Sequence, residues 1–299
     1  MSNPEPAPAD GRVAYLGPAG TFSEEALLAS AEPGRIVPVP LASIYETVAA
    51  LRRGEVDWAL VPIENSLEGS INVTLDLLAG EASDVRIVGE AILRVRHALI
   101  AAQDTTLDEI ETVLSHPQVP GQCTRFLRGE LAGAQILPAS STAEAVRIVV
   151  GKGGRTTAAL GTELAAEIYG ATILRRGVED RDDNQTRFVW LAREQDARGP
   201  APLRSGDQGE WKCSIVFWGA GAEHPGWLVR CLGELAEREI NLTKIESRPR
   251  RTRMGTYMFF ADLLGQEDQR PVADALRGLA GLCEHVGVLG TYRAAVAEA

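Results

Sequence analysis

The five residues Asn184-Gln185-Thr186-Arg187-Phe188 combine an amide, a hydroxyl and a guanidinium at the start of an apolar strand that continues to Leu191. At such a position Thr186 could donate a hydrogen bond to a departing oxygen, while Arg187 could hold a carboxylate. An ordinary edge strand explains the same residues, because Thr and Phe pack well in strands and an exposed Arg is solvated. Taken alone, the segment slightly favours the ordinary strand, so its meaning depends on the other motifs.

A glycine-rich turn, Gly17-Pro18-Ala19-Gly20-Thr21-Phe22-Ser23, joins the first expected strand to the first expected helix. Its free backbone N–H groups lie at the positive end of the helix dipole, which favours an anion. Thr21 is expected to cap the helix, with Glu24 as its capping-box partner. Anion binding and simple capping explain this turn equally well.

A second polar turn follows the expected strand that ends at Val61-Pro62-Ile63. Ligand clefts of α/β sheets usually lie at such strand ends. The turn offers Glu64 as an acceptor, Asn65 as an amide and Ser66 as a hydroxyl. On its own it favours a polar turn without a ligand.

A third turn, from Ser115 to Cys123, again joins a strand end to a helix start. Ser115 could bind a ligand oxygen, and Gln118 and Gln122 share one face of the helix that follows. Four polar turns, all at strand-to-helix junctions or strand entrances, are much less expected to arise independently than each one alone. A shared ligand site is therefore the better hypothesis.

The elements that must position these turns follow a regular alternation from residue 12 onward. Apolar strand-like runs alternate with amphipathic helix-like stretches, which predicts a mostly parallel sheet covered by helices. The expected strands are 13–16, 36–39, 57–63, 112–115, 134–138 and 157–161, with a long extended segment at 85–101. The expected helices are 21–30, 43–53, 73–78, 118–131, 142–151 and 163–169.

The alternation stops at 194–209, a stretch with Gly199-Pro200-Ala201-Pro202 and almost no apolar periodicity. This composition predicts an interdomain linker. After it, strands at 211–218, 242–248, 256–263 and 287–292 and helices at 226–238 and 272–283 give the order βαββαβ of a ferredoxin-like domain. Two domains are thus predicted, and 299 residues are enough to form them.

The composition of the chain argues against several classes of function. A formal net charge of −11 argues against a nucleic-acid or anionic-membrane surface, although a local cationic site could still bind an anionic substrate. No apolar run approaches membrane-spanning length, and the Pro- and Ala-rich N-terminus does not resemble a signal peptide. The four cysteines form no CxxC pair and are typical of reduced thiols in a cytoplasmic protein. No metal or nucleotide motif is found, so no metal and no cofactor are expected.

Taken together, the motifs resemble those of the prephenate dehydratase family, from about residue 13 to residue 292. The segments that carry the resemblance are Tyr15 to Ser23, Pro62 to Ser66, Ser115 to Gln118 with Gln122-Cys123, Asn184 to Phe188, and Asn241 to Pro249. The resemblance implies an α/β fold with a two-lobed catalytic domain like the type 2 periplasmic binding proteins, followed by a ferredoxin-like ACT regulatory domain. The implied boundaries are a disordered N-terminus at 1–11, a catalytic domain at 12–195, a linker at 196–209 and the ACT domain at 210–299. One lobe would take roughly 12–88 and 178–195, and the other 89–177.

The resemblance also implies an activity in L-phenylalanine biosynthesis. Prephenate would lose its ring hydroxyl and a carboxylate, giving phenylpyruvate, water and CO2. The implied catalytic residues are Thr186, Arg187, Glu64 and Asn65. The implied substrate-binding residues are Thr21, Ser23, Ser66, Ser115, Gln122 and Phe188. The implied effector-binding residues are Gly226, Leu228, Val229, Asn241, Leu242, Glu246, Ser247 and Arg248.

An aromatic amino acid, with phenylalanine expected first, would bind between ACT domains of a dimer or tetramer. The family usually reads Gly-Ala-Leu where this chain has Gly226-Trp227-Leu228, so the effector and the sign of regulation stay open. Glu64 would repel a dianionic substrate if it were ionised and faced it. Whether Thr186 transfers a proton or only donates a hydrogen bond also stays open.

Two alternatives remain at this point. Arogenate dehydratase shares the fold and the chemistry but acts on the amino-acid form of the ring, and the motifs do not separate the two activities. A non-catalytic cytoplasmic sensor of amino acids or aromatic acids could retain the same cleft. The intact Thr186-Arg187-Phe188 favours an enzyme, because a pure binder would not need it.

Overall fold

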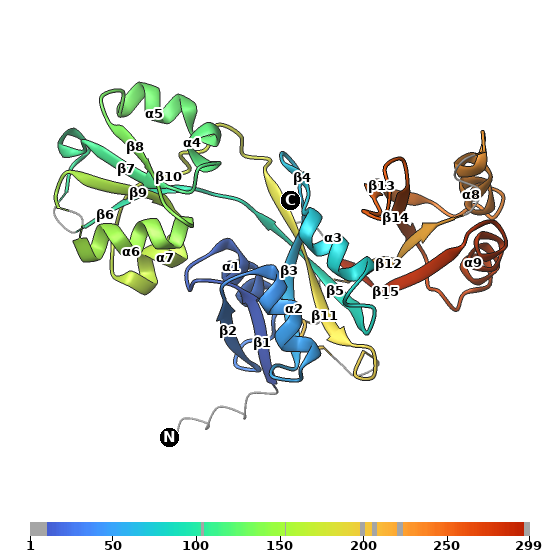
Figure 1. Cartoon of the computed structure of the whole chain (residues 1–299). Helices are drawn as coiled ribbons and strands as arrows, with labels where there is room; N and C mark the ends of the chain where they lie inside the picture. The colour runs from blue at the N-terminus through green and yellow to red at the C-terminus, as the bar shows by residue number, and fades with distance from the viewer. Residues whose placement is uncertain are drawn as a thin grey trace, which may run out of the picture.

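The computed structural model describes residues 11–102, 105–152, 154–197, 201–204, 208–219 and 224–295. The described strands form three sheets, two in a two-lobed N-terminal part and one in a C-terminal domain (Figure 1). The predicted disorder at 1–11 falls almost wholly outside the described residues, and Gly11 already belongs to the first strand. None of the described helices is long and apolar enough to cross a membrane.

The first lobe is built on a sheet with the order β2-β1-β3-β11-β5, to which the short strand β4 adds by pairing with β3. Its strands are β1 (Gly11–Leu16), β2 (Ile36–Leu41), β3 (Trp58–Asn65), β4 (Gly69–Ser70), β5 (Val85–Arg94) and β11 (Gln185–Arg193). Its helices are α1 (Phe22–Ser30), α2 (Ile44–Arg52) and α3 (Asn72–Ala79). Alternate residues of β11 are buried on both faces: Phe188 and Trp190 join the core with α1, whereas Val189 and Leu191 join the core with α2 and α3.

The second lobe is built on a sheet with the order β10-β6-β9-β7-β8. Its strands are β6 (Ala98–Ala101), β7 (Thr112–Ser115), β8 (Gln135–Pro138), β9 (Thr157–Gly161) and β10 (Thr172–Arg176). Its helices are η1 (Leu107–Glu109), α4 (Val119–Gln122), α5 (Thr124–Glu130), α6 (Thr142–Lys152) and α7 (Glu163–Tyr169). The single helix expected at 118–131 is thus two helices, which meet at Cys123 in a non-helical conformation.

The two lobes repeat one topology. In each, the first strand pairs in parallel with the second and third, and a strand that arrives from the other lobe runs antiparallel between the third and fourth. These arriving strands are β11 in the first lobe and β6 in the second. The chain therefore crosses between the lobes twice, at 95–97 and at 177–184. The predicted two-lobed α/β architecture is confirmed, but β5 stays in the first sheet as far as Arg94, beyond the expected lobe boundary at 88.

The C-terminal domain has the predicted βαββαβ order and an antiparallel sheet, β13-β14-β12-β15. Its elements are β12 (Gln208–Trp218), α8 (Trp227–Ala236), β13 (Leu242–Pro249), β14 (Tyr257–Leu264), α9 (Arg270–Leu282) and β15 (His285–Ala295). Both helices pack on one face of the sheet, over Cys213, Ile215 and Phe217 of β12. The ferredoxin-like fold is confirmed.

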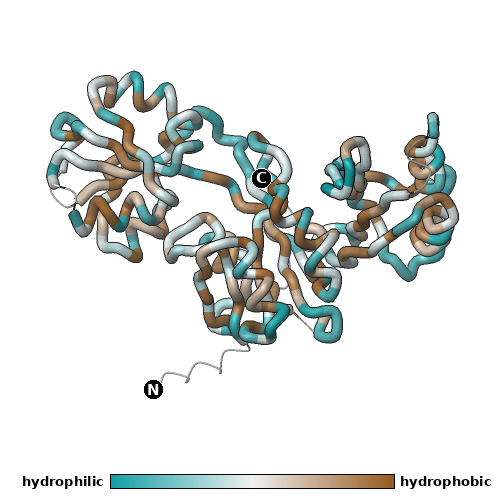
Figure 2. The backbone as a smooth tube through the Cα atoms, in the orientation of Figure 1, coloured by the Kyte–Doolittle hydropathy of each residue, from teal (hydrophilic) through white to brown (hydrophobic). Residues whose placement is uncertain are grey.

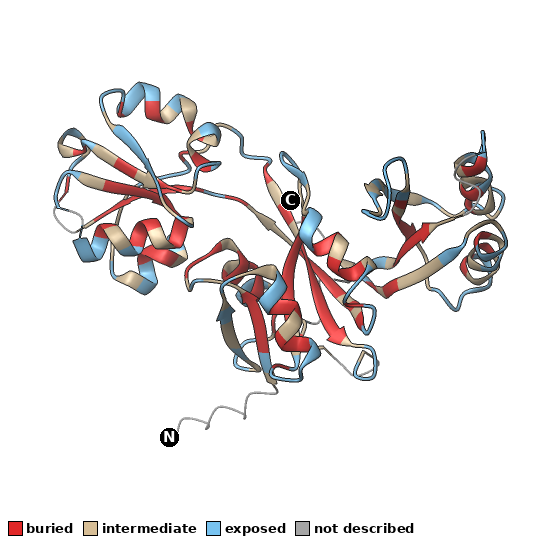
Figure 3. Cartoon of the chain, in the orientation of Figure 1, coloured by how far each residue is buried: buried red, intermediate tan, exposed pale blue. Residues whose placement is uncertain are grey.

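The other face of this sheet packs against the first lobe. Val216, Phe260 and Tyr292 belong to the same apolar core as Leu78 and Ile87 of the first lobe. A Cβ atom at Gly290 of β15 would collide with the carbonyl oxygen of Ile87, so only glycine allows the two strands to come this close. Apolar residues follow the strands of all three sheets, and buried residues concentrate there (Figures 2 and 3).

Residues 201–204 of the expected linker are attached to the end of α1, and residues 208–209 already belong to β12. The carbonyl oxygen of Pro202 accepts a hydrogen bond from the backbone N–H of Glu32 at 2.9 Å. Arg204 donates from Nε to the carbonyl oxygen of Ala31 at 3.0 Å, and Leu203 pairs with Ala31 in an isolated bridge. This segment therefore packs on the first lobe before the chain enters β12.

Candidate active site

Asn65, at the end of β3, holds the centre of a hydrogen-bonded group of side chains. Its Oδ1 accepts hydrogen bonds from the backbone N–H groups of Leu67 at 2.9 Å and Glu68 at 3.0 Å, which fixes the orientation of the amide. Its Nδ2 therefore points the other way and donates to Thr186 Oγ1 at 2.9 Å and Asn184 Oδ1 at 2.9 Å. Because Thr186 accepts this bond, its own hydroxyl proton remains available for a second partner.

Gln122 extends the group into the second lobe. Asn184 donates from Nδ2 to Gln122 Oε1 at 3.2 Å, and His97 Nε2 lies 3.2 Å from the same oxygen. Ser66 is bound at the other side, where its Oγ accepts from the backbone N–H of Gln185 at 3.0 Å. We call Asn65, Gln122, Asn184 and Thr186 the amide network. It joins β3, β11 and α4 with the second crossing between the lobes, residues 177–184, which we call the return crossover.

Two members of the amide network, Asn184 and Thr186, are buried, whereas Asn65 and Gln122 are partly exposed. Asn184 is 3% exposed and Thr186 is 9% exposed. Hydrogen bonds in such surroundings are electrostatically stronger than in water, and a buried polar group without a partner is costly. The sequence motifs included Asn184, but its role as the link between Asn65 and Gln122 was not predicted.

A bulge in β3 sets which side chains join this network. Arg187 pairs with Glu64 and Phe188 with Pro62, so Ile63 is an extra residue in β3. Such a bulge re-aims the residues that follow it. As a result Asn65 lies beside Thr186, while Glu64 lies on the other face of the sheet beside Arg187.

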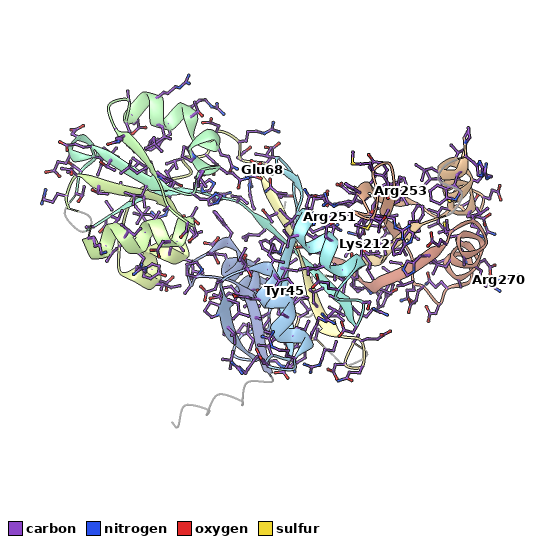
Figure 4. All side chains as sticks on the ribbon, viewed as in Figure 1. Tyr45, Glu68, Lys212, Arg251, Arg253 and Arg270 are labelled. Atoms are coloured by element: carbon purple, nitrogen blue, oxygen red, sulfur yellow. The ribbon has the colours of Figure 1, made fainter. Side chains whose placement is uncertain are left out.

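Three carboxylates, two from the first lobe and one from the C-terminal domain, contact the guanidinium of Arg187. Its Nη1 lies 2.7 Å from Asp262 Oδ2 and 3.2 Å from Glu90 Oε2, and its Nε lies 3.3 Å from Glu64 Oε2. Two lysines of the C-terminal domain complete the group, with Lys212 Nζ 2.8 Å from Glu90 Oε1 and Lys244 Nζ 3.0 Å from Glu64 Oε2. We call these six residues, three cations and three anions, the interdomain ion cluster. Figure 4 labels Lys212 where the C-terminal domain faces the first lobe.

These positions differ from the expected substrate-facing roles of Arg187 and Glu64. Consecutive residues of a strand project to opposite faces, so Thr186 and Arg187 cannot face the same ligand without a break in the strand. Burial alone would lower the pKa of Arg187, but the surrounding carboxylates, Asp262 first, raise it above its usual range. The guanidinium is thus held as a cation by Asp262, Glu90 and Glu64. Glu64 is paired with Arg187 and Lys244, on the face of the sheet opposite to Thr186.

The glycine-rich turn before α1 makes contacts between the lobes. Thr162 donates from Oγ1 to the carbonyl oxygen of Gly20 at 2.6 Å, and Tyr169 donates from its hydroxyl to the carbonyl oxygen of Ala19 at 3.0 Å. The expected capping box is wrong: Thr21 donates from Oγ1 back to Leu16 O at 3.0 Å and does not cap α1. Glu24 instead accepts from the backbone N–H of Gly20 at 2.6 Å.

Three other expected substrate residues are buried outside the amide network. Ser115 is 1% exposed and its hydroxyl lies 3.4 Å from the carbonyl oxygen of Leu160 inside the second lobe. Phe188 packs in the core of the first lobe with Tyr15 and Leu27. Ser23 is buried at the start of α1. Elsewhere between the lobes, Gln118 Nε2 lies 3.4 Å from Glu68 Oε2, and Figure 4 labels Glu68 at the β3–β4 turn.

The expected effector residues fall into separate places. Gly226, Leu228 and Val229 line a cavity of about 220 Å³ in the C-terminal domain. The remaining lining residues are His224, Trp227, Gly255, Tyr257 and Phe259. Trp227 is 4% exposed and donates from Nε1 to the carbonyl oxygen of Leu282 at 2.8 Å, so it forms a wall of the cavity that is fixed in the core.

The expected effector residues of β13 lie elsewhere. Glu246 accepts from Ser70 Oγ at 2.8 Å, and Arg248 pairs with Asp76 of α3 through Nε at 3.0 Å and Nη2 at 2.9 Å. Both contacts tie the C-terminal domain to the first lobe. Leu242 packs towards the core under the helices, whereas Asn241 and Ser247 are exposed.

Within the described residues, no group of three or more His, Cys, Asp and Glu side chains could hold a metal ion. The amide network offers a hydroxyl and carboxamides that form hydrogen bonds. Such a site can orient a polar ligand and can stabilise a departing oxygen.

Comparisons with known proteins place this geometry in a family. Residues 13–196 match the family model of prephenate dehydratase, and residues 221–281 match that of the ACT domain. A prephenate dehydratase from Mycobacterium sp. (strain JLS) is 40% identical over 291 residues, which cover 94% of this chain and 88% of the relative. One from Mycobacterium leprae (strain TN) is 38% identical over 294 residues, which cover 96% of this chain and 88% of the relative.

Solved structures agree in fold over almost the whole chain. The prephenate dehydratase of Arthrobacter aurescens in complex with L-Phe has a TM-score of 0.81 and 33% identity, covering 94% of this chain and 89% of that one. GqqA, described as a novel type of quorum quenching acylase, has a TM-score of 0.81 and 31% identity, covering 95% and 98%. The family matches in sequence and fold together show that the chain belongs to the prephenate dehydratase family, the hydro-lyases of phenylalanine biosynthesis, and that it carries an ACT domain.

Proposed function

We propose that Thr186 donates a hydrogen bond to the departing ring hydroxyl during the conversion of prephenate into phenylpyruvate, water and CO2. The observation that carries this proposal is the bond from Asn65 Nδ2 to Thr186 Oγ1, with the Asn65 carbonyl fixed by two backbone N–H groups. Thr186 is an acceptor in this bond, so its proton is free for the substrate. Donation from Asn65 also polarises the hydroxyl and makes it a better donor.

Beyond this hydrogen bond, the reaction needs little general-acid catalysis. The bond between the ring and its carboxylate breaks, its electron pair completes the aromatic ring, and the ring C–O bond breaks. The leaving oxygen takes up one proton from solvent and departs as water, and the carboxylate departs as CO2. A Thr hydroxyl is a weak general acid near neutral pH, so a hydrogen bond that strengthens as negative charge develops on the leaving oxygen is the better role for Thr186.

Residues around the amide network would orient the substrate. Gln122 and Ser66 are held at the network itself, whereas Thr21 and Ser23 are buried at the start of α1, where Glu24 already accepts from the Gly20 N–H. Asn184 joins this set because it connects Asn65 to Gln122. Arg187 and Glu64 would act through the interdomain ion cluster rather than on the substrate.

Regulation would begin at the cavity of the C-terminal domain. Its lining is largely apolar and includes three aromatic residues, Trp227, Tyr257 and Phe259, which suits the side chain of an aromatic amino acid. The relative from Arthrobacter aurescens is described in complex with L-Phe, and we take phenylalanine as the effector to test first. The enzyme would act in the cytoplasm as a homo-oligomer joined through its ACT domains.

The test compares Thr186→Val with Thr186→Ser. Val keeps the shape and removes the hydroxyl, so turnover of prephenate should fall by roughly 100-fold or more, whereas Ser should retain most of it. Phenylpyruvate formation is followed with and without phenylalanine or tyrosine. Near-normal kcat in Thr186→Val would refute the role of Thr186.

The parent chain also separates the alternative activities. Turnover of arogenate in preference to prephenate would assign the arogenate activity. No turnover of either compound by correctly folded protein would favour the sensor. Because one relative is described as an acylase, acylase activity without prephenate turnover would also refute the proposal.

A further inference from the structure

His97 lies where both lobes and both crossovers meet. It is 2% exposed and occupies the first crossover, between β5 and β6. Its backbone N–H donates to Glu179 Oε2 at 2.8 Å, and its carbonyl oxygen accepts from the N–H of Val178 at 3.1 Å, so it is tied to the return crossover. Its ring meets the edge of Phe22 of α1 at a centroid distance of 5.3 Å. His97 thus contacts the return crossover and α1 at the junction of the lobes.

The direction of each hydrogen bond in the amide network can be deduced from its fixed end. The backbone N–H groups of Leu67 and Glu68 can only donate, so Asn65 presents its oxygen to them and its nitrogen to Asn184. Asn184 must then present its oxygen to Asn65 and its nitrogen to Gln122. Gln122 therefore presents its oxygen to both Asn184 and His97.

This order determines the state of the imidazole. Since the atom 3.2 Å from His97 Nε2 is the acceptor Gln122 Oε1, Nε2 carries the proton. Nδ1 is one of four buried side-chain atoms that have no partner among the described residues. A second proton there would leave a buried N–H without an acceptor, and burial lowers the pKa of His97. The ring is neutral, with a single donor that faces Gln122.

We propose that His97 is a positioning residue for the reaction: its Nε2–H holds the carboxamide of Gln122 in the one orientation that keeps Asn184, Asn65 and Thr186 in register. This inference rests on the proposed function. The network is fixed at one end by the backbone N–H groups of Leu67 and Glu68, and at the other by His97. Without the His97 donor, Gln122 is free to turn its nitrogen towards Asn184 Nδ2, and two donors cannot pair.

The location of His97 makes the same bond sensitive to lobe closure. Gln122 belongs to α4 of the second lobe, and its backbone oxygen also accepts from the N–H of Asp180 at 2.6 Å. Asn65 belongs to the first lobe. His97 thus holds the side chain of Gln122 at the hinge, where the second lobe supplies its only member of the amide network.

The test is a series of substitutions at His97. A Gln side chain can place an amide N–H near the position of Nε2, an Asn side chain reaches only as far as Nδ1, and Leu offers no donor. We expect His97→Gln to retain kcat within a few fold, and His97→Asn and His97→Leu to lower it by roughly 10- to 100-fold. KM for prephenate should change less than kcat, because the imidazole is 2% exposed and its one donor faces Gln122. Thermal unfolding of the Gln and Asn variants provides the control for a purely structural effect.

Two further measurements bear on the same bond. In a double-mutant cycle, His97→Leu and Gln122→Leu should be strongly non-additive, because each removes the same interaction. In ¹⁵N spectra of the parent enzyme, the His97 resonance that disappears in His97→Gln should show protonated Nε2 and unprotonated Nδ1 at neutral pH. An imidazolium or the opposite tautomer would overturn the inference. So would equal kcat for the Gln and Asn variants at equal stability, or additive effects in the cycle.

Failure of this inference is distinguishable from failure of the proposed function. Full activity in Thr186→Val would refute the role of Thr186 and remove the basis for the inference. A large loss in Thr186→Val, together with indifference to the residue at position 97, would refute the positioning role alone.

Discussion

Substitution of Arg187 tests whether this residue of β11 holds the C-terminal domain on the first lobe. Its side chain is 12% exposed, and the interdomain ion cluster has three cations and three anions. Arg187→Met keeps an apolar stem and removes one cation, so the formal charge of the cluster changes from 0 to −1. Breaking a buried ion pair by removing one partner typically costs ~3–5 kcal/mol. Because Lys212 still pairs with Glu90, we expect about 3 kcal/mol.

The matched variant combines Arg187→Met with Asp262→Asn. It removes one charge of each sign, and therefore restores neutrality in the cluster. If the cost in Arg187→Met comes from an uncompensated carboxylate, the double variant should be the more stable by ~2 kcal/mol. Thermal and denaturant unfolding of the full chain give the stabilities, and prephenate kinetics with and without phenylalanine give KM and the effector response. Both variants should bind prephenate almost normally and respond less to phenylalanine.

A guanidinium that held a substrate carboxylate would give a different result. KM for prephenate would then rise by roughly tenfold or more in Arg187→Met and would stay raised in the double variant, since Asp262→Asn cannot replace a cation. Such a result, with an intact effector response and no recovery of stability, would refute the interdomain role that we derive for Arg187.

Two further predictions concern the contacts between lobes and between domains. Burial, with a contribution from Glu163, raises the pKa of Glu25 from 4.5 to about 7. Between these two pH values the native state binds more protons than the unfolded chain. The stability of the protein therefore falls as pH rises through this window. Glu25→Gln should therefore stabilise the protein at pH 8, by at most ~3 kcal/mol, and much less at pH 5. The control is Glu111→Gln, at an exposed position. Equal effects of Glu25→Gln at both pH values would contradict the reasoning. Gly290→Ala should lower Tm and weaken the effector response, because its Cβ atom would collide with Ile87, whereas Gly281→Ala in α9 has open space and should be neutral or slightly stabilising. An unchanged Tm in Gly290→Ala would show that β15 and β5 can separate without cost.

Much of the fold follows from local patterns in the sequence. Alternation of strands and helices, the Gly- and Pro-rich break and the βαββαβ order each depend on neighbouring residues, and the structure confirms the two-lobed and ferredoxin-like folds. The extended segment at 85–101 is harder to divide, because no Gly, Pro, Asn or Asp marks a turn between β5 and β6. The change of sheet at 95–97 depends on distant pairing, β5 with β11 and β6 with β9 and β10.

The candidate site was predictable where it depends on adjacent residues and not where it depends on distant ones. Asn65 and Thr186 lie in polar turns that the sequence marks, and the alternation of a strand could already have indicated that Arg187 faces away from Thr186. Its partner Asp262 is 75 residues away in another domain, which no local pattern reveals. His97 lies in an extended stretch with no motif of its own, and its partner Gln122 is 25 residues away.

In β11, Thr186 of the amide network and Arg187 of the interdomain ion cluster are adjacent residues. Thr186 projects to the face where its hydroxyl accepts from Asn65, which also bonds Asn184. Arg187 projects to the face where Asp262 and Glu90 fix its guanidinium. A strand is stiff over two residues, so a displacement of the C-terminal sheet that moves Asp262 acts on the same peptide units that position Thr186. We therefore expect an effector in the ACT domain to act on the contact between Thr186 and Asn65.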